Sequence, residues 1–427
     1  MKIRLTINKR RKDELGFYII MFYFFCLDYL YIAFPGLNLI FNSKLIGIVL
    51  MGSVVLIQAK RLIKMPATLF LFYIAAFIFI TISMLISEDN RYYIMESVLS
   101  LNNLKQIVFL PLAVFFMNSV SEFNTRMYRF SYFALAYYLI IYGLYFVNAT
   151  IEGGFYSSYG MLLGFQSTFF LLYILQHGFI NMNSVDFIFG VIFGLAIISF
   201  ASRSVIIIMG VSVLVYFYVY IGSGNKVKQL MIMLLISMVS LFLYLNFELF
   251  VQLLIKLLSG FSNLGRTLSF LKNTKWLFDS DGRSDIWGVC IDEIRRAPIN
   301  IRGLGGDVSV LTKKLGSDFY AHNFILELLL EFGIILGSFL VYLYIKMVHR
   351  TVCLGDIEKK KALLPFSIMV STVLFFSLNC WTCPWLWMYI VLYLGWVNAK
   401  TKKIYINNKR ERFRKNEKIL LHSRELL

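Results

Sequence analysis

Residues 67–87 read ATLFLFYIAAFIFITISMLIS, an apolar run without one charged side chain. A helix needs roughly 20 such residues to cross the hydrocarbon core of a bilayer. Similar runs recur between Leu15 and Val397, which is typical of a polytopic membrane protein rather than of a single signal sequence. The first run lacks a small-residue cleavage site, so we interpret it as an anchor.

Composition favours the same class, because 59% of the 427 residues are hydrophobic and only 15% are charged. We expect an all-α, polytopic membrane protein of about 12 transmembrane helices with one long extracytoplasmic loop containing short helices. The expected spans are 15–35, 43–58, 67–87, 98–118, 129–148, 159–177, 186–201, 204–222, 229–247, 323–346, 363–379 and 384–398. The chain then divides into spans one to nine (1–247), the loop (248–322), spans ten to twelve (323–398) and a basic tail (399–427).

A net charge of +18 could indicate a protein that binds nucleic acid. The distribution of the basic residues along the chain argues against such binding. Most Lys and Arg residues lie in the two tails and in alternate short loops, as the positive-inside rule requires of cytoplasmic segments. We therefore expect an inner (plasma) membrane protein with both termini cytoplasmic. The basic tail is expected to lie on the anionic lipid of the inner leaflet.

Small residues and cysteines are less informative about the fold and the function. Three pairs, Gly160/Gly164, Gly190/Gly194 and Gly333/Gly337, have the spacing that lets helix backbones approach closely. No internal repeat of the kind found in many transporters is evident. The motif Cys380-Trp-Thr-Cys383 lacks a βαβ context, so packing or bridged cysteines at a helix turn are favoured over redox chemistry.

The long loop contains three recognisable parts. Its apolar start, 249–258, is too short to span and is expected to rest in the interface. Gly282-Arg283-Ser284-Asp285-Ile286-Trp287 begins a helix that Pro298 ends, with an expected apolar face of Ile286, Trp287, Ile291 and Ile294. The turn at 303–307 is too loose for a phosphate loop and no Walker lysine follows it.

Three residues stand where helices begin on the expected outer face. Arg203 opens span eight, Arg283 opens the loop helix, and His322 precedes span ten. Helix amino termini attract anions, and guanidinium groups match phosphate, so together they predict a diphosphate site. The same dipole keeps His322 neutral, as a general base requires. With four histidines in the chain and no HEXXH pattern, we expect no metal site and no cofactor.

Each of these residues also has a plain structural interpretation. Arg203 alone could reach lipid headgroups, Arg283 could be a solvated charge, and His322 could cap its helix. Glu327 and Glu331, four residues apart in span ten, could relay protons or face a polar cavity.

The order of these motifs resembles the O-antigen ligase/polymerase superfamily, which holds Wzy-type polymerases and WaaL-type ligases. The shared features are Ser-Arg after span seven, the long outer loop with GRxxxW, the proline and glycine-rich turn, and His322-Asn323 opening a helix. They cover about 202–340. Gly333 fits the ligase pattern, but Leu336 stands at its last place and Gly337 comes one residue late.

The resemblance implies a membrane glycosyltransferase that uses an undecaprenyl-diphosphate-linked oligosaccharide, with a flippase and a chain-length regulator as partner proteins. It implies catalytic roles for His322, Arg283 and Arg203. The expected substrate-binding residues are Arg203, Arg283, Asn323, Arg266, Asp285 and Glu327. The reaction would be metal-independent and inverting, and would build O-antigen or capsular polysaccharide on the outer side of the membrane.

Two other functions remain open. A ligase would use the same chemistry to transfer glycan to lipid A-core or to protein. A flippase or other transporter of lipid-linked glycan would concentrate polar residues at the membrane midplane, whereas this sequence concentrates them at the outer boundary.

Overall fold

The structure is a computed structural model, and it describes most of the chain between the two tails. The described residues are 9–29, 47, 49, 52–53, 65–152, 158–200, 203–221, 283–316, 320–376 and 378–397. Every regular element among them is a helix, so the all-α class is confirmed for this part of the chain. Spans 43–58 and 229–247 fall mostly or wholly outside it.

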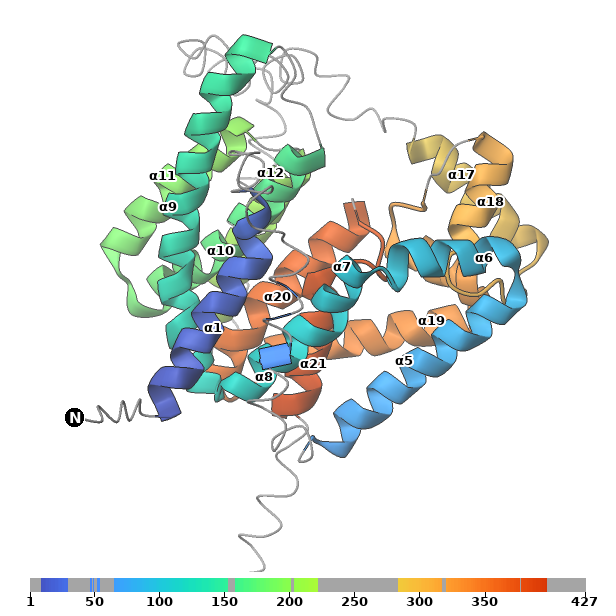
Figure 1. Ribbon diagram of the computed structural model, residues 1–427, viewed down its shortest axis with the longest axis horizontal. Helices are drawn as coiled ribbons and strands as arrows, with labels where there is room; N and C mark the ends of the chain where they lie inside the picture. The colour runs from blue at the N-terminus through green and yellow to red at the C-terminus, as the bar shows by residue number, and fades with distance from the viewer. Residues whose placement is uncertain are drawn as a thin grey trace, which may run out of the picture.

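The helices form two groups that meet at a central layer (Figure 1). One group holds α1 (Lys9–Phe25), α9 (Val120–Glu152), α10 (Ser158–Asn181), α11 (Ser184–Phe200) and α12 (Arg203–Tyr216), which continues into the π-helix η3 (Phe217–Ile221). The second holds α5 (Ala67–Ile86), α6 (Glu88–Tyr93), α17 (Arg283–Arg296), α18 (Gly306–Leu315) and α19 (Phe324–Val352). The layer between them contains α8 (Leu110–Met117), α20 (Ile357–Phe376) and α21 (Pro384–Val397).

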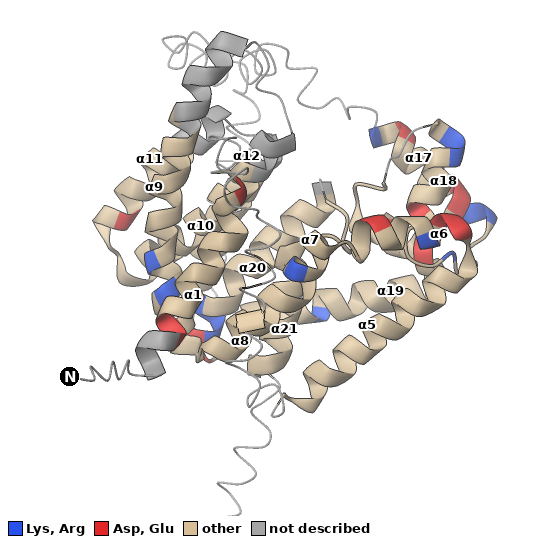
Figure 2. Cartoon of the chain, in the orientation of Figure 1, with Lys and Arg blue, Asp and Glu red and all other residues tan. Residues whose placement is uncertain are grey.

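A few of these helices are long and apolar enough to cross a membrane. Within the described residues they are α5, α10 over Leu163–Asn181, and α19, with a fourth if one bent pair of helices counts as a single span. These helices are the features expected of a membrane protein. Figure 2 shows acidic and basic residues gathered on α6, α17 and α18, while α5 carries none along its length.

The expected span 98–118 is not one straight helix. The chain passes through π-helix η1 (Ile94–Val98), α7 (Leu101–Leu104) and π-helix η2 (Lys105–Phe109) before α8, and the piece Leu101–Met117 is bent by 58° from the preceding piece Glu88–Val98. The break lies at Ser100, whose hydroxyl caps α7 by accepting from the amide of Asn103 at 3.3 Å. A capping serine within an apolar run restarts the helix in a new direction.

A second break lies inside α19. Gly333 has φ 70° and ψ 172°, a conformation almost restricted to glycine. The backbone groups released by the break bond to the loop, because the Ile334 amide donates to Pro298 O at 2.7 Å and the Arg302 amide donates to Glu331 O at 2.8 Å. Irregular backbone at membrane depth is tolerated where protein satisfies it in this way.

The break corrects the interpretation of the pair Gly333/Gly337. We expected this pair to bring two different helices together, but a Cβ on Gly337 would lie 2.6 Å from Leu328 O of the same helix. The close approach is therefore between the two halves of α19. At the pair Gly190/Gly194, Cβ atoms would meet the side-chain ends of Leu175 in α10 and Met209 in α12 within 3 Å, so α11 packs closely there against side chains of both helices.

Helix ends that were predicted to share one side of the membrane lie together. Asn124 near the start of α9 donates to Glu358 O at the start of α20 at 2.8 Å, and Lys359 donates to Trp396 O at the end of α21 at 2.6 Å. At the opposite end, the start of α19 meets the turn between α20 and α21. Which end faces the cytoplasm stays a prediction.

Candidate functional site

The described part of the loop packs onto the first half of α19. Helix α17 begins at Arg283 and ends at Arg296, two residues before Pro298, as predicted. Its buried face differs from the predicted one, because Ile291 is exposed and Cys290 is fully buried between Ile286 and Ile294. The spacing i, i+4, i+8 explains why Cys290 rather than Ile291 is buried, since Ile286, Cys290 and Ile294 lie on one side of the helix. They form a small core with Leu311, Ala321 and Leu330.

The backbone amide and the backbone carbonyl of Ala321 each form a hydrogen bond with a side chain of the loop. The Asp307 Oδ2 atom accepts from the Ala321 amide at 3.0 Å, and the indole Nε1 of Trp287 donates to the Ala321 carbonyl at 3.0 Å. Asp307 stands in the first turn of α18, and Trp287 stands one turn after Arg283 in α17. Two helices of the loop thus position the backbone immediately before His322.

His322 adopts a left-handed backbone conformation with φ 52°, which is uncommon for a residue other than glycine. Asn323 follows as the N-cap of α19, and its side-chain oxygen accepts from the amides of Ile325 and Leu326 at 3.0 and 3.3 Å. The Asn323 oxygen is therefore engaged in capping, a structural task beside the substrate-binding one predicted for it. Helix α19 begins at Phe324, directly after His322-Asn323, where the sequence predicted a helix start.

Arg283 and His322 share one corner of the molecule through Tyr320. The rings of Tyr320 and His322 lie with their centroids 3.9 Å apart. Burial raises the pKa of the Tyr320 hydroxyl to about 12, and the nearby positive charge of Arg283 acts in the opposite direction. This corner stands at the start of α19, beside the start of α17.

The other predicted site residues lie elsewhere or are not described. Arg203 is the first residue of α12, as predicted, but its side chain lies outside the described part of the structure, and α12 packs on α10, α11 and α20. Arg266 also lies outside the described residues. Asp285 is exposed in the first turn of α17. Glu327 is fully buried and accepts from Cys380 N and Sγ, both at 3.1 Å.

The glycine-rich turn at 303–306 has no amide left for phosphate. The Gly305 amide donates to Glu331 Oε1 at 2.7 Å, and the Leu304 amide donates to Ser83 Oγ of α5 at 2.9 Å. Gly303 also donates to the backbone of Glu331. Both Gly303 and Gly305 have φ 78°, and a Cβ on Gly305 would collide with the ring of Tyr93. The turn is a structural connection between α5, α6 and α19, which agrees with the sequence interpretation.

Sequence reasoning missed the acidic groups beneath this corner. Asp307 is fully buried, and burial raises its pKa to about 6. Glu293 of α17 accepts from Lys314 at 2.5 Å and from Arg302 at 3.1 Å, and the Lys314 bond is the main reason that the pKa of this carboxyl is lowered. An acidic residue directly after two glycines is typical of the first turn of a helix, and this pattern in the sequence could have indicated Asp307.

Sequence reasoning also missed a buried charge in the layer between the two groups. Lys105 of η2 is 8% exposed, and its ammonium donates to the hydroxyl of Tyr23 in α1 at 2.9 Å. The visible signal was a lone lysine within the apolar run 98–118. Ionisable residues in such positions are functional candidates, and π-helices are frequent near functional sites. Polar groups are therefore not confined to the predicted outer boundary.

Cys380 and Cys383 are both buried and unbridged in the turn between α20 and α21, which fits packing cysteines. Among the residues that the structure describes, no cluster of three or more His, Cys, Asp or Glu side chains is arranged to hold a metal ion. Comparison with protein families, curated proteins and solved structures finds no match to this chain.

Proposed function

We propose that the chain is a membrane glycosyltransferase that polymerises undecaprenyl-diphosphate-linked oligosaccharide repeat units into O-antigen or capsular polysaccharide on the outer side of the membrane. The observation that carries the proposal is the clamp on Ala321. Trp287 links the helix that begins with Arg283 to the residue before His322 through one 3.0 Å hydrogen bond. A cation and a base candidate are thereby held in one corner at a helix start.

The proposed reaction uses each group in one role. A hydroxyl of the acceptor sugar attacks the anomeric carbon of the donor glycan, and His322 accepts the hydroxyl proton. The bond from that carbon to the diphosphate oxygen breaks, and the lipid diphosphate leaves with the electron pair. Arg283, with Arg203 as its proposed partner, stabilises the negative charge that develops on the leaving group. The product keeps the growing glycan on the acceptor's own lipid diphosphate, with inverted configuration at the new linkage.

The chemistry of the proposed substrate favours a site at the membrane boundary. The donor's lipid must remain in the bilayer while its sugars reach water. The corner lies at the start of α19, a helix apolar enough to span, and beside a loop whose α17 and α18 carry many charges (Figure 2). A boundary between apolar helix and charged loop suits a substrate with these two parts.

A ligase that transfers glycan to lipid A-core or protein is the nearest alternative, because its chemistry at the donor is the same. The phenotype of a gene deletion separates the two. Loss of a polymerase leaves single repeat units attached to the acceptor, whereas loss of a ligase leaves none attached. We favour the polymerase and expect single attached repeats.

A lipid-linked glycan transporter is favoured by one specific observation. Lys105 is buried against Tyr23 in a segment bent by 58°, and broken helices with buried charges are found at transporter binding sites. Purified protein given lipid-linked repeat units without an energy source separates these classes. Only the enzyme releases free lipid diphosphate.

The proposed role of His322 is tested in the producing cell. We expect His322→Ala to remove long glycan chains while the protein remains in the membrane at its usual level. His349→Ala is the matched control, since His349 lies in the last turn of the same helix, α19, at the opposite end. Long chains of unchanged length in the His322→Ala strain would overturn the assignment.

A further inference from the structure

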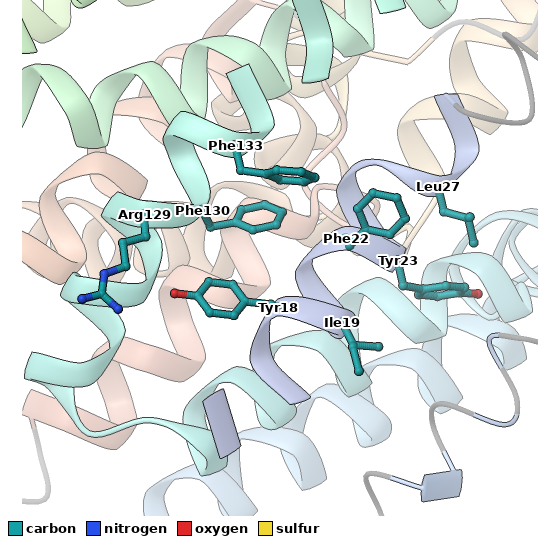
Figure 3. A pocket seen from close by; sticks show the side chains of 8 residues that line it. All are labelled: Tyr18, Ile19, Phe22, Tyr23, Leu27, Arg129, Phe130 and Phe133. Carbon is teal, nitrogen blue, oxygen red and sulfur yellow. The ribbon is translucent and has the colours of Figure 1, made fainter. Parts of the chain in front are cut away.

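A groove runs between α1 and α9, at the edge of the molecule away from the proposed site. Its volume is about 670 Å3, within the range of small-molecule sites. The lining side chains are Tyr18, Ile19, Phe22, Tyr23, Leu27, Arg129, Phe130 and Phe133. Figure 3 shows the rings of Phe22, Phe130 and Phe133 gathered along it, with the guanidinium of Arg129 at one end. The groove is thus apolar along its length and positively charged at one end.

The length of the groove corresponds to one leaflet of a bilayer. Its lining on this side runs from Tyr18 in α1 to Leu27, two residues past the end of that helix, which at 1.5 Å per residue is roughly 14 Å. Half of the hydrocarbon core of a bilayer is about 15 Å. Arg129 stands at the end where α1 and α9 begin, so the charged end falls at a membrane interface and the aromatic part reaches toward the midplane.

The charge at this end is available to an anion. The side chain of Arg129 is 64% exposed and forms an ion pair with Glu14 at 3.5 Å, and exposed pairs of this kind contribute little energy. The neighbouring Arg126 is buried and donates instead to Met117 O and Asn118 Oδ1. Helix α1 also begins with four consecutive basic residues, Lys9, Arg10, Arg11 and Lys12. The Tyr18 hydroxyl points toward the Arg129 guanidinium in Figure 3.

We propose that this groove binds one anionic phospholipid of the leaflet on the side where α1 begins. One acyl chain lies along Phe22, Phe130 and Phe133, and the headgroup phosphate lies against Arg129. A bare apolar groove would hold any lipid, so the arginine is the feature that selects an anionic one. The site does not depend on the proposed reaction, whose lipid-linked donor would lie at the opposite end of the helices.

The test measures lipid retained by the full-length protein in detergent. Protein is mixed with equal amounts of phosphatidylglycerol and phosphatidylcholine, and bound lipid is counted by native mass spectrometry. We expect the anionic lipid to be retained about fivefold more than the neutral one, the ratio that corresponds to one basic residue near a charged lipid surface. Arg129→Gln should abolish this preference. Arg350→Gln is the matched control, because Arg350 is exposed at the same end of the molecule, and it should leave the preference unchanged.

The aromatic wall is tested by a second variant. Phe133→Ser should lower the retention of both lipids while leaving their ratio unchanged, because Phe133 contacts the chain and not the headgroup. The proposal is overturned if the wild type retains both lipids equally, or if Arg129→Gln keeps the full preference for phosphatidylglycerol. It is also overturned if no lipid is retained, which would mean that another part of the chain fills the groove.

Discussion

The indole Nε1 of Trp287 donates to the carbonyl of Ala321 at 3.0 Å, and this bond joins the helix that begins with Arg283 to the residue before His322. The two residues are separated by 34 positions in the chain. Asp307 holds the amide of the same alanine from the other side. The backbone entering His322 is therefore set by the loop and not by α19 itself.

Trp287→Phe should test this connection. The substitution keeps the ring and removes the donor, so it costs about 1 kcal/mol of unfolding free energy for the lost hydrogen bond. We expect a larger proportional loss of glycan polymerisation than of stability, because the bond positions His322. Trp387→Phe is the control, since its indole donates to Trp381 O at 3.1 Å and not to the backbone before His322. Equal activity losses in the two variants would contradict a positioning role for Trp287.

Gly333→Ala should destabilise the junction of loop and α19. A Cβ there would lie 3.1 Å from Pro298 O and from the backbone of Ile299, and the φ of 70° disfavours any side chain. We expect a loss of roughly 1–3 kcal/mol, measured by thermal unfolding in detergent. Gly288→Ala is the control, because a Cβ at this helical position meets nothing within 4 Å, and it should stabilise α17 slightly. A neutral Gly333→Ala would mean that α19 can run unbroken.

Asp307 predicts a dependence of stability on pH. Burial raises its pKa from 3.8 to about 6, so the folded protein binds a proton more tightly than the unfolded chain between these values. This contribution to stability is fully present below pH 3.8 and is lost as the pH rises through about 6, and it is on the order of 3 kcal/mol. Asp307→Asn keeps an oxygen that can accept from Ala321 N and should flatten the unfolding profile between pH 4 and 6. An unchanged profile would show that Asp307 ionises without cost.

The pair of Lys105 and Tyr23 predicts non-additive stability effects. Tyr23→Phe leaves a buried ammonium without the hydroxyl that it contacts at 2.9 Å, and we expect a loss of about 2 kcal/mol. Adding Lys105→Met removes the charge as well, so the double variant should recover part of this loss, although Asp28 then loses the attraction of Lys105. The measurement is thermal unfolding of the two single variants and the double variant. Additive effects would show that the two side chains are not coupled.

The sequence could predict the local features of this fold. The bounds of α17 and the start of α19 follow from neighbouring caps and from Pro298, and the apolar character of α5 follows from its composition. The break at Gly333 could not be predicted, because it is satisfied by Pro298 and Arg302, which lie about 30 residues earlier in the chain.

The candidate site was predictable only in part, for the same physical reason. The sequence pointed to Arg283 and His322 as residues at helix starts, and both lie near Tyr320. The clamp by Trp287 and Asp307 depends on contacts between α17, α18 and the residue before α19, which no local pattern reports. Lys105 was visible as a single charge, but its partner Tyr23 lies 82 residues away.

The central claim is that the corner of Arg283 and His322 transfers glycan from lipid diphosphate. The most direct measurement uses the purified full-length protein with lipid-linked repeat units and no energy source, and it quantifies free lipid diphosphate together with glycan length. We expect the wild type and His349→Ala to release lipid diphosphate and lengthen the glycan, and His322→Ala to be slower by at least about 100-fold. Absence of free lipid diphosphate with the wild type, or an undiminished rate with His322→Ala, would contradict the account.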